Sequence, residues 1–348
     1  MDTQNSLSEI DKIKTQLQSV QLPANLLEKA QHQIDRITYA MKYGGNLSQM
    51  DITAKYIDWI THLPWETKTV DQLDVAKAKI ALDQYHFGLE KIKERVLEYL
   101  SVLILQKQNL HHETFHAPSL FFVGLAGTGK TTFAKSIADA LGRKFIRIPF
   151  GGLSSALDLR GQSKTAPEAE PGAMIRALRR CGSKNPVVLL DELDRTTPET
   201  RAEIMGVLIE LLDPEQNSSF IDYFIDYPFD LSQVLFVATA NNTNNINTAV
   251  LDRLEVIQMP SYNDEEKIHI GKFFVLPRYI KDTGLTTQNL TLTEGVWEKL
   301  VRPLGFEPGI RSLERVLEEI VRKVSLKIVS VQGTSFEINE NNFREFVN

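Results

Sequence analysis

Residues 124–131 read GLAGTGKT and fit the spacing G-x-x-x-x-G-K-[ST]. The apolar run SLFFV precedes them and a helical stretch follows, which is the context that this motif requires. Backbone N–H groups of such a loop surround phosphate oxygens, and the helix N-terminus adds the positive end of its dipole. We therefore predict a nucleotide site in which Lys130 reaches the β- and γ-phosphates and Thr131 ligates Mg²⁺. Its lining residues are Gly124, Leu125, Ala126, Gly127, Thr128, Gly129, Lys130, Thr131 and Thr132.

Two carboxylates follow a second apolar run, VVLLDE, further along the chain. The reaction needs one acid at the metal and another beside the nucleophile. We expect Asp191 to hold Mg²⁺ through water and Glu192 to polarise the attacking water. A third run, VLFVATAN, ends at Asn241, whose amide could position that water near the γ-phosphate. Taken alone, an asparagine there is more typical of a turn.

Arg253 stands in AVLDRLEVI, between a helix and a further strand. It could pair with Asp252 or Glu255 in its own chain. It could instead act as an arginine finger that stabilises charge on the γ-phosphate bound by a neighbouring subunit. Because the phosphate loop, the paired acids and Asn241 precede it in order, we favour the finger.

A parallel sheet is needed to position these motifs. The runs SLFFV, KFIRIPF, PVVLLDE and VLFVATA are continuously apolar rather than alternating, which indicates strands covered on both faces. We predict an α/β P-loop NTPase fold with a parallel sheet core over residues 71–260. A helical unit over residues 1–70, with one helix ended by Gly44 and Gly45, precedes it, and a helical lid over residues 261–348 follows.

Composition narrows the class of protein. The 348 residues carry a net charge of −6 with scattered Lys and Arg, which argues against a sequence-independent grip on nucleic acid. We interpret the densest basic run, IRALRRCGSK, as a helix with a solvated basic face. The single cysteine, Cys181, allows no disulfide within the chain, and we expect it to be buried. No apolar run reaches membrane-spanning length and no signal peptide is evident, so we expect a cytosolic protein without membrane contact.

Together the motifs resemble the ATPase module of Lon proteases, a branch of the AAA+ superfamily. The resemblance is carried, in order, by YHFGLEKIKERVLEYL, GLAGTGKT, LGRKFIRIPFGG, RGQSKT, NPVVLLDELD, LLDPEQN, LFVATAN, LDRLEVI, PSYNDEEK and EPGIRSLER. It implies ATP or ADP and Mg²⁺ as cofactors, a homo-oligomeric, hexameric ring and protein substrates. It also implies roles for Asn241 as sensor 1, Arg253 as the trans-acting finger and Arg311 as sensor 2. The adenine would lie between His86, Phe87 and Gly88 on one side and Tyr262 and Ile270 on the other.

Lon proteases continue into a domain with a serine nucleophile activated by lysine. No serine of this chain has a recognisable nucleophile setting, so we expect no peptidase activity from it. A protease domain or partner would act in trans, and the chain could be either a piece of a full protease or a natural ATPase that works without one. The alternative class is a nucleotide-gated scaffold or switch, or a remodeller of nucleic acid. The acidic charge and the Lon-type strings count against nucleic acid.

The segment SKTAPEAEPG, residues 163–172, differs from the family where substrate is gripped. The Lon family carries there an aromatic–aliphatic pair, followed by glycine, that projects into the channel of the ring. Here Ala166, Pro167 and Glu168 follow Thr165, and without a large apolar side chain the loop has little to hold a polypeptide by. We therefore expect ATP hydrolysis with poor pulling of folded proteins, unless Phe150 or neighbouring loops supply the grip.

Overall fold

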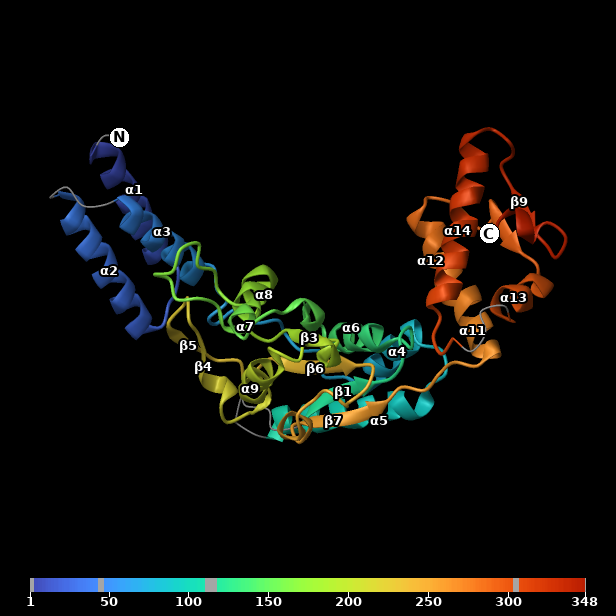
Figure 1. Ribbon diagram of the computed structural model, residues 1–348, viewed down its shortest axis with the longest axis horizontal. Coiled ribbons are helices and arrows are strands. Elements are labelled where there is room, and N and C mark those ends of the chain that lie inside the picture. Colours follow the sequence, from blue (N-terminus) through green and yellow to red (C-terminus); the bar gives the residue numbers. More distant parts are fainter. Residues whose placement is uncertain (1–2, 43–46, 110–117, 303–306, 348) are drawn as a thin grey trace.

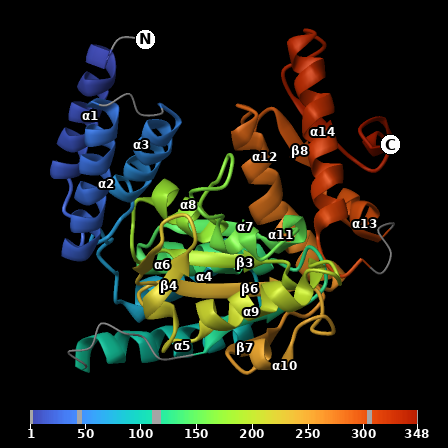
Figure 2. The same cartoon turned by 60° about the vertical axis from the view of Figure 1, so that its left-hand side comes forward.

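The computed structural model describes residues 3–42, 47–109, 118–302 and 307–347. A central sheet carries one arm at each end, the N-terminal helices on one side and the C-terminal lid on the other (Figure 1). Turned by 60°, both arms still rise on the same side of the sheet (Figure 2). Among the described residues, none of the helices combines the length and the apolar character needed to cross a membrane.

The N-terminal arm is made of α1 (Thr3–Gln18), α2 (Ala24–Lys42) and α3 (Leu47–Thr61). The predicted helix end at Gly44 and Gly45 lies outside the described residues. Apolar side chains of the three helices, such as Leu26 and Ile57, join one hydrophobic cluster with the side chains beneath one face of the sheet. The arm is therefore packed onto the sheet rather than tethered to it.

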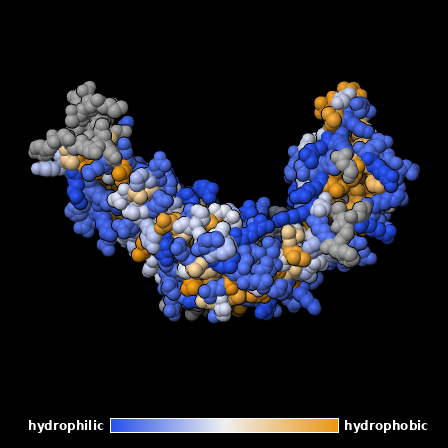
Figure 3. All heavy atoms as spheres, in the orientation of Figure 1, coloured by the Kyte–Doolittle hydropathy of each residue, from blue (hydrophilic) through white to orange (hydrophobic). Residues whose placement is uncertain are grey.

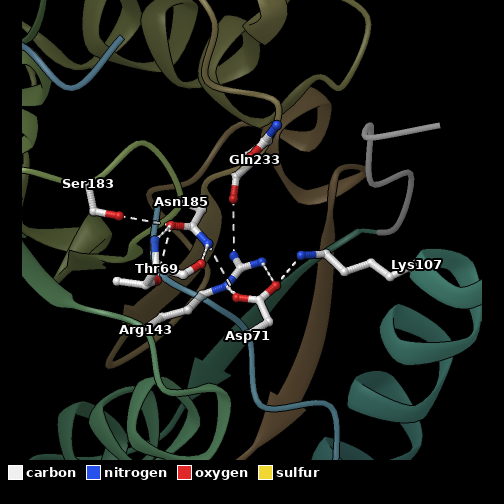
Figure 4. A network of polar contacts seen from close by, with 7 residues as sticks. All are labelled: Thr69, Asp71, Lys107, Arg143, Ser183, Asn185 and Gln233. Carbon is white, nitrogen blue, oxygen red and sulfur yellow. Dashed lines mark hydrogen bonds and ion pairs between the residues drawn. The ribbon is translucent and has the colours of Figure 1, made fainter. Parts of the chain in front are cut away.

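A polar network fixes the chain between α3 and α4 (Val75–Tyr85) to the sheet (Figure 4). Asp71 accepts hydrogen bonds from Arg143 Nε at 2.7 Å and Nη2 at 2.8 Å, and it also pairs with Lys107. The Asn185 side chain accepts from the Thr69 N–H at 2.8 Å and donates to the Thr69 carbonyl at 2.9 Å. Charge-assisted, two-pronged contacts of this kind hold geometry well, so the connection between arm and sheet is rigid.

The sheet has the strand order β2-β3-β6-β1-β7, with all pairs parallel. Its strands are β1 (Ser119–Val123), β2 (Phe145–Pro149), β3 (Val187–Asp191), β6 (Leu235–Ala240) and β7 (Leu254–Gln258). The apolar runs of the sequence form these strands, and β1, β3 and β6 are buried along their whole length. The prediction of a parallel sheet covered on both faces is confirmed.

Successive side chains of each strand enter opposite layers of the core. One face packs under α8 (Ala173–Cys181) and α9 (Arg201–Leu212), and the other under α4, α5 (Glu90–Asn109) and α6 (Lys130–Leu141). Short helices α7 (Leu157–Arg160) and α10 (Thr248–Leu251) complete this domain. Cys181 ends α8 and is buried as a free thiol, as expected.

Short strands were missed by the sequence prediction. A hairpin of β4 (Phe220–Asp222) and β5 (Tyr227–Phe229) precedes β6, and the lid contains a parallel pair, β8 (Leu290–Leu292) with β9 (Phe336–Ile338). The lid helices are α11 (Asp264–Ile270), α12 (Leu276–Asp282), α13 (Glu294–Val301) and α14 (Arg311–Val329). The lid has its own hydrophobic cluster. Apolar side chains also gather at the free tip of α14, where Val329 and Val331 are exposed (Figure 3).

Candidate nucleotide site

The phosphate loop connects β1 to α6, and its glycines serve two purposes. Gly127 and Gly129 have φ angles of 82° and 89°, in the left-handed region that glycine adopts at little cost. At Gly124 the reason is space instead, because a Cβ there would lie 2.6 Å from the Met259 carbonyl oxygen. The loop thus closes against the end of β7 and presents its backbone at the carboxyl edge of the sheet.

Lys130 and Asn241 meet beside this loop. The Lys130 ammonium donates to the carbonyl oxygens of Gly124 and Leu125, the latter at 2.9 Å, and to Asn241 Oδ1 at 3.2 Å. Burial lowers the pKa of Lys130, while the nearby carboxylates oppose that shift. A phosphate oxygen offers this ammonium a charged acceptor, which forms a stronger hydrogen bond than a carbonyl does.

The paired acids lie beside Lys130 at the end of β3. Asp191 is buried and accepts hydrogen bonds from Thr239 Oγ1 and, at 2.6 Å, from Arg147 Nε. Glu192 has a φ of 60°, which costs a non-glycine residue about 1 kcal/mol and is typical of functional positions. Its N–H donates to Thr239 Oγ1 at 3.0 Å, and its carboxylate lies 3.4 Å from Arg195.

The donor set fits Mg²⁺. Thr131 occupies the first turn of α6, and Asp191 already stabilises a positive charge, since the Arg147 guanidinium contacts it. Mg²⁺ is usually bound through one or two carboxylates, waters and substrate phosphates rather than by an all-protein cage. No group of three or more His, Cys, Asp or Glu side chains suited to a metal occurs within the described ranges. The remaining ligands would therefore come from nucleotide and water.

Residues predicted for the adenine pocket converge on the other side of the loop. His86 stacks on Phe133 at 3.6 Å between ring centroids, and its Nε2 lies 3.0 Å from Ser136 Oγ. Burial, with a smaller effect of the Lys93 charge, lowers the pKa of His86 to about 4, so the ring is neutral at pH 7. The Tyr262 hydroxyl donates to the Thr128 carbonyl at 3.2 Å.

The remaining predicted adenine residues join the sheet domain to the lid. Phe87 stacks at 3.5 Å on His269 of α11, while Ile270 lies in the lid core. Gly88 has a φ of 63°, and a Cβ there would lie 3.5 Å from Glu266 in the lid.

The lid touches the phosphate loop directly. A Cβ on Gly309 would lie 2.4 Å from the Ala126 carbonyl oxygen, so the two backbones are in closest contact there. Ile310 N–H donates to the Gly127 carbonyl at 3.3 Å. Arg311 begins α14 beside Gly127, and its charge contributes to the lowered pKa of Lys130. The structure therefore places Arg311 at the phosphate loop, where a sensor 2 arginine is expected.

Arg253 lies far from this site. Its guanidinium donates to Asp213 Oδ2 at 2.7 Å and to the Ala249 carbonyl at 2.9 Å, whereas Glu255 pairs with Arg95 at 2.8 Å. The two carboxylates considered from the sequence, Asp252 and Glu255, are thus not its partners. The Arg253 carbonyl accepts from Ser119 N–H at the amino end of β1, roughly 16 Å along the strand from the phosphate loop at 3.3 Å per residue.

The comparisons with known proteins identify the family. The ATPase family associated with various cellular activities (AAA) matches residues 120–262, and the Lon protease AAA+ ATPase lid domain matches residues 281–336. The Lon protease of Syntrophomonas wolfei is 38% identical over 340 residues, and Lon protease 1 of Bacillus subtilis is 39% identical over 346 residues. This chain belongs to the Lon family of AAA+ ATPases.

The matches to these Lon proteases cover 98% and 99% of this chain but 41% and 44% of the relatives. Lon protease 2 of Thermus thermophilus, at 37% identity, is covered to 42%. The chain thus spans about two fifths of the length of the curated relatives it matches, and that part is their ATPase part.

Several residues of this Lon-type site were not predicted. Arg147 and Thr239, which hold Asp191, are polar residues inside otherwise apolar strand sequences, KFIRIPF and VLFVATA. Their polar side chains interrupt the apolar pattern, and this interruption was the sequence signal that could have identified them. Nothing in the sequence indicated His269 as the partner of Phe87, since the two come from different domains.

The loop of residues 163–172 lies against the N-terminal arm. Lys164 stands 4.3 Å over the Tyr56 ring, and Lys55 Nζ donates to the Ala169 carbonyl at 2.8 Å while pairing with Glu170. Ala169 is buried, and Glu168 has a φ of 54° at the position where the Lon family carries glycine. The loop is therefore docked on α3.

Proposed function

We propose that this Lon-type ATPase binds ATP with Mg²⁺, hydrolyses it in a head-to-tail, hexameric ring, and uses the energy to remodel or translocate protein substrates. The observation that carries the proposal is the position of Arg253 at the amino edge of the sheet, opposite the phosphate loop. An arginine there has no access to the nucleotide of its own chain. A contact that joins the amino edge of one copy to the carboxyl edge of the next is heterologous, and such contacts generate a ring when the rotation between copies closes.

Each residue of the site has a defined part in this proposal. Lys130 and the backbone of residues 124–129 hold the phosphates, and Asp191 with Thr131 holds Mg²⁺, which neutralises charge on the β- and γ-phosphates when bound. Glu192 accepts a proton from the attacking water, which Asn241 orients. Arg311 links the phosphate state to the angle of the lid, because α14 begins at this residue.

The test separates binding from hydrolysis and hydrolysis from assembly. Lys130→Ala should lose most ATP affinity, whereas Glu192→Gln should bind ATP and not turn it over. Arg253→Ala should keep ATP binding but lose roughly 10³-fold in turnover, the scale of arginine fingers. Equal ATP affinity of wild type and Lys130→Ala would refute the site.

Mixing Arg253→Ala chains with Glu192→Gln chains tests the ring. The first keep an intact site but give no finger, and the second give a finger but have an inactive site. ATPase activity that returns in the mixture, and in neither component alone, supports a finger acting between copies. No recovery at any mixing ratio argues against it.

The docked loop favours a second function, a nucleotide-gated scaffold or switch with weak unfoldase activity. Ala166 packs against the hydrophobic cluster shared with the arm, and the ion pair from Lys55 holds the other end of the loop. A loop held this way moves little, and it offers no large apolar side chain to a substrate. A protease domain, whether covalently attached or acting in trans, would depend on this ring to deliver polypeptide substrate to it.

A further inference from the structure

Two ion pairs within the chain hold groups that the proposed reaction needs elsewhere. At the carboxyl edge of the sheet, Arg147 Nε lies 2.6 Å from Asp191, the metal carboxylate. At the amino edge, Arg253 lies 2.7 Å from Asp213, and this ion pair holds the proposed finger within its own chain. In the proposed ring, Asp191 would hold Mg²⁺ and Arg253 would reach a neighbour's phosphate, and each is freer to do so when its ion pair opens. Arg147 and Asp213 then lose their ion-pair partners.

Arg147 lines a cavity of about 710 Å³ between β2, α8 and the N-terminal arm. We call this cavity the arginine groove, because Arg147, Arg176, Arg179 and Arg180 line it together with Trp59, and its lining among the described residues includes no carboxylate. Arg179 is engaged, since it stacks on Trp59 at 4.2 Å and pairs with Asp58 at 2.7 Å. The groove therefore suits an anionic occupant.

Two other arginines of the groove, Arg176 and Arg180, are placed to contact an anionic occupant. Arg176 and Arg180 are exposed, and neither guanidinium group makes a hydrogen bond or an ion pair within the described part of the chain, although the charge of Arg176 acts on Asp222. The basic face of α8, which the sequence suggested to be merely solvated, thus forms one wall of a concave site.

The amino edge carries the matching charge. Asp213 follows α9 as its C-cap, and its carboxylate also accepts from the Glu215 N–H at 3.0 Å and from Gln216 Nε2 at 3.1 Å. Glu215 itself is exposed. Residues 213–215 therefore present two carboxylates beside Arg253, on the edge that a head-to-tail contact turns toward the next copy.

We propose that residues 213–215 of one copy occupy the arginine groove of the next, where Arg147 exchanges Asp191 for the neighbour's Asp213. The inference rests on the proposed ring. In a single chain both catalytic groups are masked, Asp191 by Arg147 and Arg253 by Asp213. Assembly with bound nucleotide and Mg²⁺ releases Asp191 and Arg253 together. Arg147 of one copy and Asp213 of the next then neutralise each other across the interface.

Charge reversal tests this pairing by sedimentation rather than by activity. Arg147→Glu chains and Asp213→Arg chains are each analysed over a range of concentrations, with Mg²⁺ and a slowly hydrolysed ATP analogue. Each variant alone places like charges at every interface, so the concentration for half-assembly should rise at least about tenfold. In an equimolar mixture, an alternating ring has complementary charges at every interface, and assembly should return to near the wild-type concentration. Arg322→Glu, at a site with 67% of its side chain exposed on α14, is the matched control and should assemble like wild type.

The outcomes separate this inference from the ring itself. A ring that forms in the wild type but is insensitive to both reversals, or single defects that mixing does not repair, overturns the exchange and leaves the ring intact. Wild-type chains that never assemble overturn both. If a reversal lowers the melting temperature, the milder Arg147→Gln and Asp213→Asn replace the pair. A double variant that assembles no more weakly than either single variant then supports the exchange, and additive losses contradict it.

Discussion

Gly309→Ala should weaken nucleotide binding, although Gly309 is not itself among the residues predicted to contact the nucleotide. The added Cβ would lie 2.4 Å from the Ala126 carbonyl oxygen and 2.5 Å from Gly127 C, whereas real Cβ contacts stay beyond 3.0 Å. The lid and the phosphate loop must therefore separate by at least roughly 0.6 Å at a backbone-to-backbone contact, where no side chain can turn away. Overpacking of this kind costs about 1–3 kcal/mol.

Because Ile310 and Arg311 follow directly, that cost falls on the arrangement that brings Arg311, the proposed sensor 2, to the phosphate loop. A penalty of 1–3 kcal/mol on the binding-competent arrangement corresponds to a Kd about 5- to 150-fold higher. Isothermal titration calorimetry with ATP and with ADP measures it. The control is Gly206→Ala in α9, where a Cβ meets nothing within 4 Å, so the Kd should not change and stability should rise by about 1 kcal/mol. A Gly309→Ala protein with a Kd within twofold of wild type would show that the close contact does not matter for binding.

Three further predictions concern the loop of residues 163–172 and its anchor. Burial raises the pKa of Asp222 to about 6, although it accepts from the Gly172, Phe224 and Ile225 N–H groups. A raised folded pKa gives stability that is present below the ordinary value near 4 and is lost as pH rises through 6. The free energy of unfolding, measured in urea relative to Asp222→Asn, should thus fall by about 2 kcal/mol from pH 4 to 7, and a flat difference would contradict this. Glu168→Gly, at a φ of 54°, should leave stability unchanged or raise it by up to about 1 kcal/mol, whereas Glu168→Val should lower it by at least about 1 kcal/mol in the same titration. Ala166→Tyr with Pro167→Ile should increase ATP-dependent unfolding of a tagged fluorescent protein, and an unmodified chain that already unfolds it as fast refutes the view that the loop limits pulling.

The sequence was sufficient where a local pattern determines structure. The apolar runs before Gly124, Asp191 and Asn241 predicted three strands of one parallel sheet, and parallel strands necessarily bring their carboxyl ends to one edge. The structure shows that these three strands are neighbours. Lys130 and Asn241 meet for that reason, although 111 residues separate them.

Contacts between side chains that are distant in sequence could not be predicted from the sequence. The partners in Arg147–Asp191 and Arg253–Asp213 are 44 and 40 residues apart, and many acids compete for each arginine. The strands β4, β5, β8 and β9 have three residues each, too few to show a period of two. The close approach of Gly309 to the phosphate loop depends on how the lid docks, which no local pattern encodes.

The separate core of the lid has a mechanical consequence. The N-terminal arm and one face of the sheet share a hydrophobic cluster, and the network around Asp71 fixes the chain between them, whereas the lid helices close around a cluster of their own. Rotating the arm would tear apart packed side chains, while rotating the lid changes only the contacts at its base. The N-terminal arm and the sheet domain thus form one stiff unit, and the lid is the part that can rotate against it. A stroke produced by nucleotide turnover would appear at the tip of α14, where Val329 and Val331 are 81% and 91% exposed, and the arm would serve as the fixed end against which that force is exerted.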